Sequence, residues 1–100
     1  MVTALNLIVS AIKSYIDRNG GQYSSWYVGI ASDPRNRLFV EHGVNETTGA
    51  WIYQKAETSS EAREIEEYLI NTLGSDGGPG GGDYSTQYVY AYRKTINTRQ

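Results

Sequence analysis

Helical and extended patterns alternate along the chain, and this alternation limits the fold more than any other feature of the sequence. Helix signals cover residues 3–18, 33–41 and 61–73, and strand signals cover 26–31, 50–55 and 86–95. Apolar residues three or four apart form a stripe on a helix, whereas alternating residues form one face of a strand. The order helix, strand, helix, strand, helix, strand predicts an α/β two-layer sandwich, with about three helices packed on three strands.

Size and composition narrow the class of protein. One hundred residues correspond to a single domain, residues 1–100, that can bury a modest core. Cysteine is absent and histidine occurs once, which excludes disulfide frameworks, thiolate zinc sites and poly-histidine metal sites. We expect no membrane span, no signal peptide and a cytoplasmic location. The net charge of −2 argues against strong electrostatic binding of nucleic acid by the whole surface and leaves a local basic patch as the alternative.

The strands have two distinct faces. Trp26, Val28 and Ile30 share one face of the first strand, which is its expected core face. In the last strand the tyrosines at 88, 90 and 92 share one face. They predict either a half-exposed tyrosine ladder or, with Arg93 and Lys94, a platform on which unpaired bases stack.

A glycine-rich segment, residues 74–85, separates the last helix from the last strand. Six glycines fall within residues 74–83, and this density predicts a flexible loop. No Gly-Lys-Ser/Thr follows, so the segment is not a P-loop.

Two polar residues fall on apolar helix faces. At about 100° per residue, Glu66 lies inside the apolar stripe of helix 61–73, between Leu73 and Ile70. His42 falls between Leu38 and Phe39 if the helix that begins at Asp33 continues that far. Each is either a functional group or a satisfied residue of the core edge, because an ionised buried carboxylate needs a partner or a metal.

Two blocks around these residues resemble the GIY-YIG nuclease superfamily. The first is residues 27–38, YVGIASDPRNRL, where a Tyr-Val-Gly strand leads through Asp-Pro into a helix bearing Arg37-Leu38. The second is residues 58–70, TSSEAREIEEYLI, where a Thr-x-x-Glu-Ala helix start is followed by Glu66. The resemblance covers residues 26–74 and implies a three-stranded, mainly antiparallel sheet.

The resemblance also implies chemistry. In this family a glutamate holds one divalent metal, usually Mg²⁺, an arginine stabilises the scissile phosphate, and a tyrosine or histidine helps to activate water. These roles would fall to Glu66, with Mg²⁺ or Mn²⁺, to Arg37, and to Tyr27 or His42.

The chain departs from the family pattern at three points. The opening Gly-Ile-Tyr strand is not found, His42 follows Arg37 by five residues where the family usually has four, and the late asparagine has no match. A π-bulge would absorb the extra residue before His42. The C-terminal strand, with Tyr88 or Tyr90, could occupy the place of the missing strand in a permuted domain.

The sequence therefore predicts a metal-dependent nuclease that hydrolyses DNA phosphodiester bonds. The alternative is a catalytically inactive module of the same fold that binds nucleic acid or a protein partner. A third reading is an unrelated α/β protein in which the two blocks match by coincidence.

Overall fold

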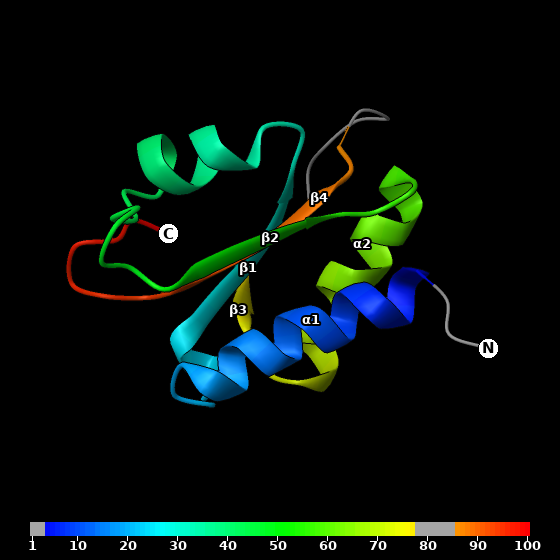
Figure 1. The fold of residues 1–100 in the computed structure, drawn as a ribbon, viewed down its shortest axis with the longest axis horizontal. Helices are drawn as coiled ribbons and strands as arrows, with labels where there is room; N and C mark the ends of the chain where they lie inside the picture. Colours follow the sequence, from blue (N-terminus) through cyan, green and yellow to red (C-terminus); the bar gives the residue numbers. More distant parts are fainter. Residues whose placement is uncertain (1–3, 78–85) are drawn as a thin grey trace.

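The computed structural model describes residues 4–77 and 86–100 (Figure 1). In chain order its elements are α1 (Ala4–Arg18), the 3₁₀ turn η1 (Tyr23–Ser25), β1 (Trp26–Ala31), the π-helical η2 (Asn36–Glu41), β2 (Trp51–Lys55), α2 (Ser59–Glu67), the π-helical η3 (Tyr68–Thr72), β3 (Asp76–Gly77) and β4 (Tyr88–Arg93). The predicted alternation of helices and strands is thus confirmed. No helix in the described residues has the length and apolarity needed to cross a membrane.

The strands form one mixed sheet in the order β2-β4-β1-β3. β4 lies between β2 and β1 and is antiparallel to both, with Tyr90 opposite Gly29 on one side and opposite Tyr53 on the other. β3 runs parallel to β1 at its far edge. The last predicted strand of the sequence is therefore a central strand of the sheet (Figure 1).

The prediction of three strands is wrong by one. Asp76–Gly77 was expected to lie in the glycine-rich loop, but it pairs with Tyr27 and Val28 of β1. Two residues are too few to show a strand period, so the pairing depends on tertiary contact alone. Residues 78–85 of the predicted loop lie outside the described residues.

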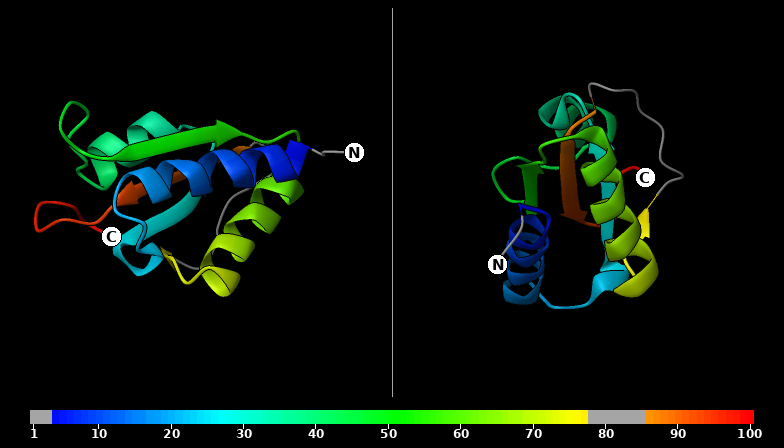
Figure 2. Two further views of the ribbon diagram at one scale, coloured as in Figure 1. Left: turned by 60° about the horizontal axis from the view of Figure 1, so that its bottom comes forward. Right: turned by 90° about the vertical axis from the view of Figure 1, so that its right-hand side faces the viewer.

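Helices α1 and α2 cover the same face of the sheet. In the right-hand view of Figure 2, α1 lies in front of β2 and α2 in front of β1. The core beneath them contains the predicted inner face of β1 and the alternate residues of β4, namely Trp26, Val28, Ile30, Val89 and Ala91. Burial of this apolar surface is the main favourable term holding the layers together.

The opposite face of the sheet is covered by η2 and carries a second, aromatic core. Tyr90 and Tyr92 are 1% and 0% exposed there, together with Leu38 and Val44. The expected half-exposed ladder or stacking platform is therefore wrong. β4 is central and η2 covers it, so two of the three tyrosines are buried.

The helix starts follow local capping chemistry. The Thr58 hydroxyl accepts a hydrogen bond from the Glu61 amide at 3.1 Å, so α2 begins at Ser59, two residues before the predicted start. The Asp33 carboxylate accepts one from the Asn36 amide at 3.1 Å and caps the helical turn that leads into η2. Gly74, predicted to end the last helix, has φ of +86°, which glycine adopts without strain.

Gly29 permits a close approach between β1 and a side chain of β4. A Cβ atom at this position would overlap the ring and hydroxyl of Tyr90, whose side chain crosses β1 there. The glycine of the Tyr-Val-Gly block is thus needed because a neighbouring phenol occupies the space of its missing side chain.

Gly29→Ala is expected to lower the free energy of unfolding by about 1–3 kcal/mol, because the added methyl overpacks the site. Urea unfolding measures the change in the wild-type and Tyr90→Ala backgrounds. The cost should shrink in Tyr90→Ala, where the phenol is absent. An equal cost in both backgrounds would show that Tyr90 is not what Gly29 accommodates.

Candidate active site

The Tyr90 phenol links the candidate residues. Its hydroxyl lies 2.8 Å from Nε2 of His42, whose ring packs against that of Tyr27. Arg37 acts on the phenol through a hydrogen bond and its charge. Glu66, on α2, is linked to the phenol by its charge alone, which is the smallest of these effects.

His42 is held on both ring nitrogens. Nδ1 lies 2.6 Å from the Arg99 carbonyl oxygen, and Nε2 faces Tyr90. The imidazole packs against the Tyr27 ring with 4.9 Å between centroids. Burial lowers the pKa of His42, while the hydrogen bond to Arg99 opposes that shift. The ring is therefore neutral at pH 7.

A π-helical turn brings His42 round to the side of Arg37. The His42 amide donates to the Arg37 carbonyl at 2.9 Å, which is an i to i+5 hydrogen bond. In an α-helix, position i+5 lies about 100° further round than position i+4, but here the i to i+5 hydrogen bond takes one extra residue into the turn. The extra residue between Arg37 and His42 is thus absorbed inside η2.

Arg37 remains accessible while it contacts the cluster. Its side chain is 42% exposed, and its Nε lies 3.4 Å from the Glu41 carboxylate one turn later. Through its charge and a hydrogen bond, it opposes the rise in the pKa of Tyr90. The guanidinium therefore joins the buried phenol to the surface, where an anionic ligand can reach it.

Burial keeps the tyrosines of the cluster protonated. Loss of water raises the pKa of Tyr90 above its usual value, and the neighbouring Tyr27 adds to the shift. The pKa of Tyr92 rises for the same two reasons. At neutral pH both phenols therefore act as hydrogen-bond donors.

Glu66 is the buried carboxylate of the site. Its residue is 4% exposed, so the predicted position inside the apolar stripe is confirmed. Burial raises its pKa from 4.5 to about 7, Arg63 opposes the shift, and Glu67 adds to it.

The donor set suits a hard divalent cation held mainly by its ligands outside the protein. No group of three or more histidine, aspartate or glutamate side chains comes together among the described residues. Mg²⁺ often binds one or two carboxylates and completes its shell with water and substrate phosphate. A single buried carboxylate, that of Glu66, fits that pattern.

Comparison of the chain with protein-family models, with curated proteins and with solved structures finds no match.

Three participants in the site were not anticipated from the sequence. The Tyr92 hydroxyl lies 3.1 Å from Nδ1 of His42, and the Arg99 carbonyl is closer still. Gly29 admits the Tyr90 ring. Alternation along β4 could have indicated Tyr92, since it shares the face of Tyr90, but a backbone carbonyl such as that of Arg99 leaves no sequence signal.

Tyr88, the alternative to Tyr90 for the missing tyrosine, lies outside the cluster. Its ring packs edge-on against Tyr53 with 5.9 Å between centroids, and Lys55 lies over it. The cations of the predicted platform are also dispersed, because Lys94 pairs with Asp76 at 3.1 Å. Of these two candidates, Tyr90 is therefore the one that contacts His42 and Arg37.

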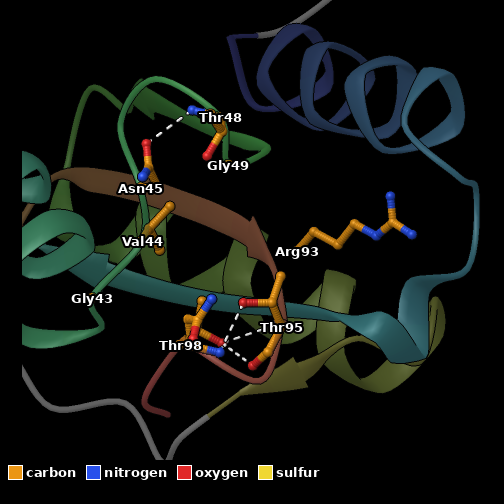
Figure 3. Close-up of a pocket in the computed structure, with 9 residues that line it drawn as sticks. Gly43, Val44, Asn45, Thr48, Gly49, Arg93, Thr95 and Thr98 are labelled. Carbon is orange, nitrogen blue, oxygen red and sulfur yellow. Dashed lines mark hydrogen bonds between the residues drawn. The ribbon is translucent and has the colours of Figure 1, made fainter.

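A separate pocket of about 510 Å³ opens between the 43–49 loop and the 93–98 turn (Figure 3). None of the five candidate residues lines it. Its side-chain oxygens already serve local turns: Asn45 accepts from the Thr48 amide at 2.9 Å, and Thr98 accepts from the Thr95 amide at 3.0 Å. We therefore do not assign a ligand to it.

Glu66→Gln is expected to stabilise the protein above pH 7. The folded pKa of about 7 exceeds 4.5, so the folded state binds the proton more tightly. The free-energy cost of ionising Glu66 in the folded protein is absent below the unfolded pKa of 4.5 and grows between the two pKa values. Above the folded pKa it reaches on the order of 2–3 kcal/mol. Urea unfolding from pH 4 to 8 should show that the free energy of unfolding gained by Glu66→Gln over wild type increases with pH.

Glu64→Gln, at an exposed position of α2, is the control. If both substitutions change the free energy of unfolding equally and independently of pH, Glu66 does not carry a buried charge.

Proposed function

We propose that the chain is a metal-dependent nuclease of the GIY-YIG type that hydrolyses DNA phosphodiester bonds. The observation that supports the proposal is the grouping of Tyr27, Arg37 and His42 around the Tyr90 phenol, on which the charge of Glu66 also acts. Two of these, Arg37 and Glu66, are the residues that the sequence resemblance assigns to phosphate and metal.

The position of β4 supports a permuted form of the family fold. The first Gly-Ile-Tyr strand is missing from the N-terminal side, and β4 pairs antiparallel with the Tyr-Val-Gly strand β1. Tyr90, opposite Gly29, would then supply the tyrosine of the missing strand. The π-turn supports the same reading, since it offsets the five-residue spacing of Arg37 and His42.

The proton path follows from the hydrogen bonds. A water oxygen attacks the phosphorus, and its proton passes to the Tyr90 oxygen while the Tyr90 proton passes to Nε2 of His42. The bond from phosphorus to the leaving oxygen breaks, and that oxygen takes a proton from solvent. The transfer is concerted because the raised pKa of Tyr90 disfavours a free phenolate.

Arg37 and Glu66 provide the charge stabilisation. The guanidinium of Arg37 can bind two oxygens of the scissile phosphate and stabilise the charge that develops on them. Glu66 would hold Mg²⁺ or Mn²⁺, which acts as a Lewis acid on the phosphate when bound. A nearby cation also favours the ionised form of this buried carboxylate.

A second candidate is a module that binds nucleic acid or a protein without cleaving. The net charge of −2 and the firmly held Tyr90 proton favour it. The two candidates differ in whether a phosphodiester bond is broken.

Nicking of supercoiled plasmid in Mg²⁺ or Mn²⁺ separates the candidates. We expect the wild type to nick, and Arg37→Ala, Glu66→Gln and Tyr90→Phe each to lose about a hundredfold or more in rate. Arg18→Ala, at the end of α1, is the matched control and should retain activity.

Nicking by wild type that all three variants retain would point to a contaminating nuclease and overturn the assignment. Failure of folded wild type to nick in either metal would favour the binding module.

A further inference from the structure

The last residues of the described chain fold back onto the imidazole of His42. Arg99 makes three contacts there: its amide donates to the His42 carbonyl at 2.6 Å, its carbonyl oxygen lies 2.6 Å from Nδ1, and its guanidinium donates to the Val40 carbonyl at 3.0 Å. These contacts anchor Arg99 and hold its carbonyl against the Nδ1 edge of the ring.

The contact at Nδ1 fixes where the proton of His42 lies. A carbonyl oxygen can only accept, so an oxygen 2.6 Å from Nδ1 requires a proton on that nitrogen. In the neutral ring Nε2 then carries the lone pair, and it accepts the Tyr90 proton at 2.8 Å. The opposite tautomer would set two lone pairs against each other at Nδ1.

The Tyr92 hydroxyl is compatible with this assignment. It lies 3.2 Å from the Gln100 side-chain oxygen, to which it can donate, and 3.1 Å from Nδ1. Its own lone pairs then face the Nδ1 proton. All polar atoms around this edge of His42 are therefore satisfied by one arrangement of protons.

We propose that the backbone carbonyl of Arg99 is a positioning group that locks His42 in the Nδ1–H tautomer and thereby makes Nε2 the acceptor for Tyr90. The proposal rests on the proposed function for its catalytic meaning. The lock itself is a property of the folded chain that can be measured without substrate. Arg99 acts through His42 and does not touch the reacting atoms.

The single histidine makes the tautomer directly observable. In ¹⁵N-labelled protein at pH 8, long-range ¹H–¹⁵N correlation distinguishes the protonated ring nitrogen from the bare one. We expect wild type to show a protonated Nδ1 and a bare Nε2. A protonated Nε2 in wild type would overturn the proposal.

Shortening the chain tests the carbonyl. Deletion of residues 99 and 100 should release Nδ1 and shift the ring toward the Nε2–H tautomer. Arg99→Ala is the matched control, because it removes the same charge and the contact to Val40 but keeps the carbonyl, so it should retain Nδ1–H. An unchanged tautomer in the folded deletion variant would overturn the proposal. If the shortened chain does not fold, Tyr90→Phe keeps the proposal testable. Without the phenol at Nε2, the Arg99 carbonyl alone should still retain the Nδ1–H tautomer, and a shift to Nε2–H would overturn the proposal.

The catalytic consequence is measured separately by plasmid nicking. The deletion should lower kcat by about tenfold or more, as the loss of other groups that orient a functional histidine does. The KM of the deletion variant should equal the KM of Arg99→Ala. An unchanged kcat in a deletion variant whose tautomer has shifted would overturn the positioning role. A wild type that has the lock but does not nick would instead refute the proposed nuclease, so the two failures are distinguishable.

Discussion

The Tyr90 phenol passes over β1 at the one residue of that strand without a side chain. This crossing carries the hydroxyl from the central strand β4 to His42, within the influence of Arg37 and Glu66. The second aromatic core of the sheet packs around the same ring. Removal of the space at Gly29 would therefore disturb both the packing of that face and the geometry of the candidate site.

The site combines groups that raise and lower one another's pKa values. Burial disfavours charge on Glu66, Tyr90 and His42 alike, so in the protein alone all three tend to be neutral. Arg37 is the accessible permanent charge of the cluster. Under the proposed function, a phosphate arriving with its divalent cation would meet Arg37 as the permanent charge, and the ionisation of Glu66 would be coupled to cation binding.

Local patterns in the sequence predicted much of the secondary structure. The alternation Trp26, Val28, Ile30 identified the inner face of β1, and the angular position of Glu66 predicted its burial, because both depend on a regular repeat. The place of β4 in the sheet was only a hypothesis, in which the C-terminal strand replaces the Gly-Ile-Tyr strand that was not found. Its tyrosines were expected to be half-exposed, and a single sequence does not say which strand is central.

The remaining features have no local signature. Asp76–Gly77 is too short to show a period, and its pairing with β1 is a tertiary contact. The π-turn before His42 differs from an α-helix by one hydrogen bond. From the sequence we could say only that such a turn was needed to bring His42 into register with Arg37. The Arg99 carbonyl belongs to the backbone, so its chemistry does not depend on the residue type that carries it.

The place of β4 has a consequence for how the chain acquires its structure during synthesis. β1 and β2 are not neighbours in the sheet, and each pairs along its length with the strand that the ribosome makes after both of them. Until β4 emerges, β1 and β2 cannot join into one sheet, so the apolar faces of these strands and of α1 and α2 have no complete partner layer. The nascent polypeptide must therefore remain soluble without its central strand, and closure of the sheet is a late event that follows translation of almost the whole described segment.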